Sequence, residues 1–216
     1  MANQRKQIDR KAEIFFEDLW KQGDPWNLET SDYERAKYER QLDLLSPRRY
    51  ARALEIGCGN GCFTRRLTTI ADHVVAIDIS ASAIARARET TPERGAIDFR
   101  VENIMEYNLR AEGSWDLVVM SETICYLGWL YSFFDVAWLA AEIFNATLVG
   151  GRFIMANTYG AGDYLLSPWI IRTYEDLFLN VGYRLESHEI FTGTKNGVDL
   201  EVLISLFVKK APANLT

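Results

Sequence analysis

The sequence contains few of the residues that build disulfide-stapled or metal-centred proteins. Its 216 residues include three cysteines and two histidines. The cysteine count is odd, and Cys58 and Cys62 lie in and just after a glycine-rich segment, so we expect reduced thiols rather than a disulfide framework. No spacing typical of metal ligands or of a Ser/His/Asp set is present, and we expect no metal site. His73 and His188 are assigned no role.

The sequence also lacks long apolar runs and an excess of positive charge. No apolar stretch approaches the ~18 residues that span a bilayer, and residues 1–11 are polar rather than a signal core. The 30 acidic and 24 basic side chains give a formal charge of -6, which argues against broad contact with nucleic acid or an anionic membrane. We therefore expect a cytoplasmic protein with a small-molecule partner, no nucleic-acid partner and no membrane insertion.

Short apolar runs alternate with helical patterns along the chain, which is typical of an α/β fold. The expected strands are 53–56, 74–79, 97–101, 117–120, 151–157, 183–190 and 200–208. The expected helices are 7–21, 32–45, 62–70, 80–89 and 133–148, with a loop at 103–115. These patterns predict a Rossmann-like, seven-stranded, mostly parallel sheet with helices on both faces. The short turn 193–197 between the last two strands predicts an antiparallel edge strand.

A glycine-rich turn follows the first expected strand. The segment Leu54-Glu55-Ile56-Gly57-Cys58-Gly59-Asn60-Gly61 runs from a strand into a helix, and glycine lets the backbone approach a ligand closely. The spacing is G-x-G-x-G, which disfavours the pyrophosphate of a dinucleotide. The carboxylate of Glu55 is suited instead to anchor a cationic amino group such as that of a methionyl moiety. A tight turn without a ligand is the alternative.

Two further strands end in polar residues suited to a nucleoside. Asp78 lies roughly 20 residues beyond the glycines, where a ribose diol would bind; a role in starting the helix after Ser80 is compatible with this. Asn103 is suited to the adenine amino edge and Ile104 to a ring face, although Asn103 is alternatively an ordinary loop residue. Ile79 is counted among the same contacts.

The fourth expected strand runs into Ser121 and Glu122 at the edge where open α/β sheets bind ligands. Together the four elements, spanning 51–157, resemble the class I S-adenosylmethionine methyltransferases. The segments Asp24-Pro25-Trp26 and Ser121-Glu122-Thr123-Ile124-Cys125-Tyr126-Leu127, with Tyr33-Glu34 and Lys37-Tyr38, further resemble the rhizobial nodulation N-methyltransferases of the NodS type.

This resemblance implies S-adenosyl-L-methionine as cofactor and S-adenosyl-L-homocysteine as product. It also implies an oligosaccharide acceptor, in which the free amine of the non-reducing-end glucosamine of a deacetylated chitooligosaccharide is methylated during nodulation factor synthesis. Where relatives are expected to have two aromatic residues, this chain has Cys125-Tyr126. Methylation of oxygen or carbon in another metabolite and a non-catalytic module that binds the cofactor remain alternatives. A nicotinamide dehydrogenase is disfavoured by the glycine spacing.

Methyl transfer from a sulfonium requires positioning of the acceptor rather than a nucleophilic residue of the protein. Glu122 is the first candidate to accept a proton from the amine or to orient its lone pair, and Tyr126 is the second. The alternative for Glu122 is a carboxylate that only binds backbone at the strand end. Ser121, Trp20 and Tyr33 are counted among the cofactor contacts.

A single domain with three parts is expected. Residues 1–50, with a break at 23–27 and many aromatic residues, are predicted to form a helical lid, or alternatively a pair of helices that only covers a sheet edge. Residues 51–157 would form the cofactor-binding core, and 158–216 the acceptor-side segment with the antiparallel strands. Within this last part, Asp163 is suited to meet an amine or hydroxyl, with a solvent-facing loop as the alternative.

Overall fold

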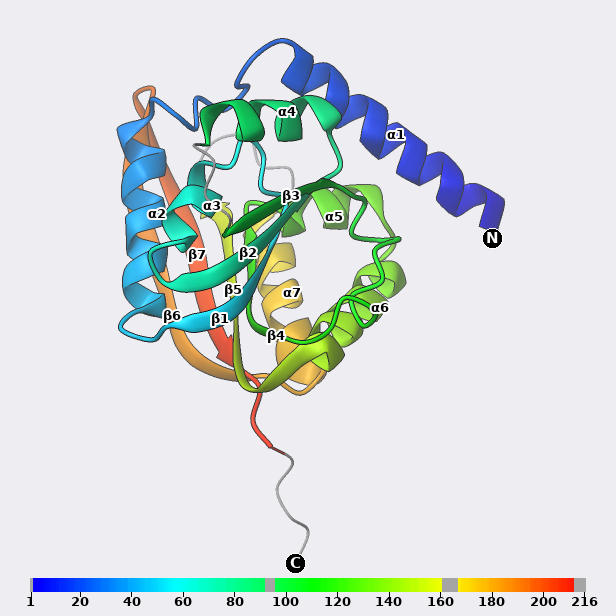
Figure 1. Ribbon diagram of the computed structural model, residues 1–216, viewed down its shortest axis with the longest axis vertical. Helices are drawn as coiled ribbons and strands as arrows, with labels where there is room; N and C mark the ends of the chain where they lie inside the picture. Colours follow the sequence, from blue (N-terminus) through cyan, green and yellow to red (C-terminus); the bar gives the residue numbers. More distant parts are fainter. Residues whose placement is uncertain (1, 92–95, 161–166, 212–216) are drawn as a thin grey trace, which may run out of the picture.

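A seven-stranded sheet lies at the centre of the computed structural model, which describes residues 2–91, 96–160 and 167–211 (Figure 1). The strands are β1 (Tyr50–Ile56), β2 (Ala71–Asp78), β3 (Ile97–Val101), β4 (Trp115–Ser121), β5 (Thr147–Gly160), β6 (Arg184–Lys195) and β7 (Val198–Val208). The helices are α1 (Ala2–Lys21), α2 (Asp32–Leu45), α3 (Cys62–Leu67), α4 (Ala81–Thr90), α5 (Ile124–Leu130), α6 (Phe133–Ala146) and α7 (Pro168–Asn180). The predicted Rossmann-like α/β architecture is confirmed.

The strand order is β3-β2-β1-β4-β5-β7-β6. The first five of these strands pair in parallel, and β7 pairs antiparallel with both β5 and β6, so the hairpin of β6 and β7 forms the antiparallel edge that was expected. From β1, the chain builds the sheet outward through β2 and β3, and then returns to β4 on the other side. Ligands of open α/β sheets bind at such a switch point, beyond the carboxyl ends of the strands.

Both faces of the sheet are covered, because alternate residues of a strand point to opposite sides. Leu54 and Phe153 belong to a cluster with residues of α5, α6 and α7. Ala53 and Ile154, each next to one of these in sequence, belong to a cluster with residues of α2 and α3. The near-continuous burial of β1, β2 and β4 is what a parallel strand between two helical layers requires.

The helix expected at 62–70 ends earlier, at Leu67. The hydroxyls of Thr68 and Thr69 donate to backbone carbonyls three residues back, a local bond that competes with helix continuation. The helix expected at 133–148 likewise ends early, and β5 begins at Thr147.

The predicted hairpin is present, but its turn is shorter than the five-residue segment expected at 193–197. Asn196 has φ 53° and Gly197 has φ 77°, so both residues of a two-residue turn lie in the left-handed region. An Asn-Gly pair is well suited to this turn, and it allows β6 to continue to Lys195.

Two helices, α5 and α7, lie outside the segments predicted to be helical. α5 is short and largely apolar, so it carries little helical periodicity. α7 begins with Pro168 in its first turn, where the missing N–H of proline costs no helical bond. No helix in the described part of the chain is long and apolar enough to cross a membrane.

Candidate active site

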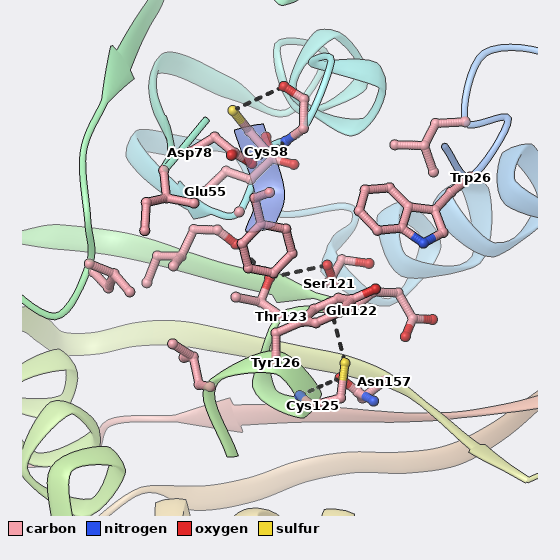
Figure 2. Close-up of a pocket in the computed structure, with 18 of the residues that line it drawn as sticks. Trp26, Glu55, Cys58, Asp78, Ser121, Glu122, Thr123, Cys125, Tyr126 and Asn157 are labelled. Atoms are coloured by element: carbon pink, nitrogen blue, oxygen red, sulfur yellow. Dashed lines mark hydrogen bonds between the residues drawn. The ribbon is translucent and has the colours of Figure 1, made fainter. Parts of the chain in front are cut away.

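A cavity of about 360 Å3 lies beyond the carboxyl ends of β1, β2 and β4 (Figure 2). It reaches from Asp78 at one end to Tyr126 and Asn157 at the other, with Ser121 and Glu122 between them. The predicted site residues that line it are Trp20, Tyr33, Glu55, Gly57, Cys58, Gly59, Asp78, Ile79, Asn103, Ile104, Ser121, Glu122 and Tyr126. The fold therefore brings residues from distant parts of the sequence to one wall.

The glycine-rich turn gives the cavity a wall of bare backbone. Gly57 and Gly59 have φ of 78° and 54°, and an added Cβ would approach Thr123 Oγ1 to 2.6 Å or the Trp20 ring to 2.9 Å. Larger residues are excluded at both positions. Gly61 was expected to contact the cofactor but does not line the cavity; its φ is 76°, and a Cβ there would meet the Phe99 ring at 2.9 Å. Glycine at position 61 is explained by packing instead.

Asp78 is fixed at the end of β2 by backbone groups. Its two carboxylate oxygens accept hydrogen bonds from the N–H groups of Gly59 and Ser80, each at 2.9 Å. Burial raises the pKa of Asp78, and these hydrogen bonds oppose the rise. Ser80, not Asp78, caps α4 by accepting from Ala83 N. Asp78 therefore ties the glycine turn to β2 and lines the cavity at the same time.

Glu55 is buried beneath the same turn. Its carboxyl group accepts a hydrogen bond of 2.5 Å from Thr64 Oγ1. Burial raises the pKa of Glu55 to about 8, and the neighbouring charge of Asp78 adds to the rise. At neutral pH this carboxyl group is therefore largely protonated in the folded protein.

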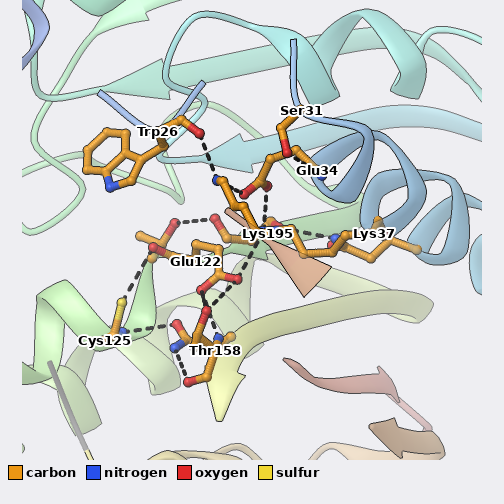
Figure 3. A network of polar contacts seen from close by, with 12 residues as sticks. Trp26, Ser31, Glu34, Lys37, Glu122, Cys125, Thr158 and Lys195 are labelled. Carbon is orange, nitrogen blue, oxygen red and sulfur yellow. Dashed lines mark hydrogen bonds and ion pairs between the residues drawn. The ribbon is translucent and has the colours of Figure 1, made fainter. Parts of the chain in front are cut away.

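Glu122 lies in the middle of the cavity, directly after β4. Its backbone is in the left-handed region, with φ 57°. Its side chain accepts from Thr158 N at 2.8 Å, from Thr158 Oγ1 at 3.0 Å and from Lys37 Nζ at 3.0 Å (Figure 3). The backbone contact weighed as an alternative is thus present, and the carboxylate lines the cavity as well.

Lys37 of α2 is a site residue that sequence reasoning did not assign. Its side chain is 2% exposed, and its ammonium pairs with Glu34 at 2.7 Å and Glu122 at 3.0 Å. Burial by itself lowers the pKa of Lys37, but the two carboxylates raise it well above the ordinary value, so the group stays charged. The signal was the polar face of the helix 32–45, where Glu34 and Lys37 stand one turn apart.

Lys195, at the tip of the hairpin, was also missed. Its ammonium donates to Trp26 O at 2.7 Å and to Glu34 Oε1 at 2.6 Å (Figure 3). The hairpin is thereby joined to the N-terminal segment over the cavity. That segment contributes Trp20, Trp26 and Tyr33 to the wall, while its action as a lid stays a prediction.

Of the remaining residues considered in the sequence, Tyr126 and Cys125 line the cavity. Tyr126 packs beside the Trp26 ring at 6.0 Å, and burial raises the pKa of its phenol. Cys125 lines the cavity and, like the other two cysteines, is free, as predicted. Asp163 lies outside the described residues. Within the described residues, no group of three His, Cys, Asp or Glu side chains is placed to hold a metal ion.

Comparison with known proteins identifies the family. A sequence model of the nodulation protein S (NodS) family matches residues 9–143, which is more than half of the chain. The chain belongs to the nodulation protein S family. The matched residues run from α1 to α6 and include most of the cavity wall.

Two curated members of the family show the extent of the likeness. Nodulation protein S of Sinorhizobium fredii (strain NBRC 101917 / NGR234) is 32% identical over 123 residues, covering 56% of this chain and 53% of that protein. Nodulation protein S of Rhizobium tropici is 33% identical over 106 residues, covering 49% of this chain and 44% of that protein. The chain spans about half the length of the curated relatives it matches.

A solved structure shows the same fold over nearly the whole chain. The N-methyltransferase NodS from Bradyrhizobium japonicum WM9, crystallised in complex with S-adenosyl-L-homocysteine, matches with a TM-score of 0.75 and 21% identity. The match covers 93% of this chain and 99% of that one. The likeness establishes the architecture, including the mixed sheet.

Proposed function

We propose that this protein is an S-adenosyl-L-methionine-dependent N-methyltransferase of the free amine on the non-reducing-end glucosamine of a deacetylated chitooligosaccharide. The observation that carries the proposal is one cavity that joins a glycine turn and Asp78 at one end to the carboxylate of Glu122 further along it. Membership of the nodulation protein S family supports the acceptor, and the relative named an N-methyltransferase supports the reaction.

The residues at the first end fit S-adenosyl-L-methionine. Gly57 and Gly59 present backbone without a side chain to the cavity, so a ligand can approach the backbone there. Asp78 would accept from the ribose hydroxyls. Glu55 would release its proton to solvent when the cationic amino group of the methionyl moiety binds, and it would then pair with that group. Ile104 would cover a face of the adenine. When bound, the cofactor supplies an electrophilic methyl group on a sulfonium.

The residues at the other end fit an amine. Lys37 and Thr158 hold the carboxylate of Glu122 in one position, so Glu122 can orient the amine and accept the proton that the amine must lose before it attacks. Because its pKa is raised, Tyr126 stays a neutral phenol and would act as a hydrogen-bonding partner rather than as a base. The aromatic rings of Trp26 and Tyr126 would face the sugar.

Mass spectrometry of chitotetraose and chitopentaose tests the proposal. Each sugar, with and without its terminal N-acetyl group, is incubated with the protein and S-adenosyl-L-methionine. We expect the gain of one methyl group, confined to the deacetylated sugars. The Asp78→Ala variant, which lacks the proposed ribose contact, serves as the negative control.

Titration calorimetry with S-adenosyl-L-homocysteine separates the two halves of the proposal. Binding of this ligand without modification of any sugar would overturn the acceptor and leave methylation of another metabolite or a binding module. Absence of binding would overturn the cofactor.

A further inference from the structure

Helix α1 brings a buried carboxylate to the adenine end of the cavity. Asp9 is 8% exposed, and its Oδ1 accepts hydrogen bonds from Tyr131 Oη at 2.8 Å and from Asn103 Nδ2 at 3.1 Å. Asn103 and Tyr131 line the cavity, whereas Asp9 lies behind them and is not part of the wall. Any effect of Asp9 on a ligand therefore passes through these two residues.

The contacts of Asn103 decide which way its amide points. Oδ1 accepts from Met105 N at 3.0 Å, while Nδ2 faces Asp9 Oδ1 and, at 3.4 Å, Tyr131 Oη. A reversed amide would set an oxygen against the carboxylate and a nitrogen against an N–H donor, so this orientation is determined. With both Nδ2 protons directed at Asp9 and Tyr131, the second lone pair of Oδ1 is what Asn103 offers to a ligand.

Asp9 also holds the hydroxyl proton of Tyr131. Its other oxygen, Oδ2, is buried without a hydrogen-bond partner among the described residues. Arg5, one turn earlier on α1, pairs with Asp135 at 2.8 Å rather than with Asp9. The carboxyl group of Asp9 therefore stands behind the adenine end with no salt bridge among the described residues, and its Oδ1 holds the donors of Asn103 and Tyr131.

We propose that Asp9 is a positioning residue that makes the site selective for a 6-aminopurine. By drawing the donors of Asn103 and Tyr131 away from the cavity, Asp9 leaves acceptors facing it. The exocyclic amino group of adenine is a donor and matches them, whereas the 6-oxo group of hypoxanthine is an acceptor and is repelled. The inference rests on the proposed cofactor.

Calorimetry with two ligands tests the inference without any catalytic step. S-adenosyl-L-homocysteine and its 6-oxo analogue, S-inosyl-L-homocysteine, are titrated into the parent protein and into Asp9→Ala. We expect the parent to prefer the adenosyl ligand about tenfold or more, the factor that one mismatched buried hydrogen bond gives. In Asp9→Ala the freed donors can pair with the 6-oxo group, so the preference falls to about threefold or less.

Glu17→Gln is the control that separates a general loosening of α1 from a specific effect on Asn103 and Tyr131. Glu17 also fastens this helix to the core, by accepting from the hydroxyls of Ser80 and Ser82, but it does not contact Asn103. Glu17→Gln should weaken both ligands by the same factor and keep the preference. Asp9→Leu, which is similar in shape to aspartate and has no hydrogen-bond acceptor, replaces Asp9→Ala if the alanine variant fails to fold, as judged by circular dichroism.

The outcomes are distinguishable. A parent protein that binds both ligands equally, or an Asp9 variant that keeps the parent preference, overturns the inference and leaves the proposed function standing. A parent protein that binds neither ligand overturns the proposed cofactor and the inference together.

Discussion

Asp78 and Glu122 each combine a structural bond with a carboxylate that lines the cavity. Asp78 receives the backbone N–H of Gly59, and Glu122 receives the backbone N–H of Thr158. Each carboxylate is thereby oriented before a ligand arrives, which lowers the cost of ordering on binding. Changes at the two positions should separate binding of the cofactor from turnover.

Asp78→Ala should weaken S-adenosyl-L-methionine binding by about 100-fold. The variant removes a charged acceptor from both ribose hydroxyls, and hydrogen bonds to charged groups are worth about 1.5–3 kcal/mol each. Titration calorimetry measures the change. Asp72→Ala, at an exposed position of the same strand, is the control and should bind as the parent does. Unchanged affinity in Asp78→Ala would remove Asp78 from the site.

Glu122→Gln should leave cofactor affinity unchanged and lower kcat by about 10- to 100-fold, because an amide keeps the shape but accepts no proton. Initial rates on the deacetylated sugar, with calorimetry in parallel, check both parts. Glu189→Gln, which changes a carboxylate paired with Arg40 on the sheet edge, is the control and should retain turnover. Full activity of Glu122→Gln would leave no catalytic part for Glu122.

At the scale of elements, the hairpin of β6 and β7 depends on its two-residue turn. Gly197→Ala should destabilise the protein by about 1 kcal/mol, because an alanine in the left-handed region pays a steric cost. No atom lies within 4 Å of the added Cβ, so the effect is conformational rather than a clash. Urea unfolding measures it, with Glu201→Ala on β7 as the control. Equal stability of parent and Gly197→Ala would contradict the assigned turn.

The elements differ in how far local sequence determines them. β1, β2 and β4 are buried on both faces and therefore read as continuous apolar runs. The glycine turn has its own spacing, so its place on the cavity wall was predictable, while its contact with the cofactor stays a prediction. α5 has neither periodicity nor caps that mark it, since Thr123 makes no capping bond with its side chain.

The acceptor end was harder to predict because long-range packing decides it. Lys37 and Glu122 are 85 residues apart in sequence and meet only when α2 lies against the sheet. The polar residues of α2 therefore look like an ordinary solvated helix face until the sheet supplies their partners. Asn103 was correctly placed on the wall, but the hydrogen bond to Asp9 spans 94 residues and has no local signal.

For the whole molecule, Glu55 links folding to pH. Its pKa rises from 4.5 to about 8 on folding, so the folded state binds more protons between these values. The stability that this protonated group contributes is fully present below pH 4.5 and is lost as pH rises through about 8. The parent should therefore lose stability relative to Glu55→Gln over this range, by up to about 4 kcal/mol.

Thermal or urea unfolding of the ligand-free protein at several pH values between 4.5 and 9 checks this. Glu39→Gln, at an exposed position of α2, should not reproduce the pH dependence. A stability difference between the parent and Glu55→Gln that stays constant across the range would show that Glu55 is ionised in the folded state.

The hydrogen bond between Lys195 and Trp26 has a consequence for synthesis of the protein. This bond to the Trp26 carbonyl joins residues 169 positions apart, so it can form only after β6 has been synthesised. A nascent chain that has emerged as far as the end of β5 already holds the glycine turn, Asp78 and the partners of Glu122, whereas the bond between Lys195 and Trp26 is still missing. On the ribosome, most of the cavity wall would therefore assemble before the hairpin is joined to the N-terminal segment.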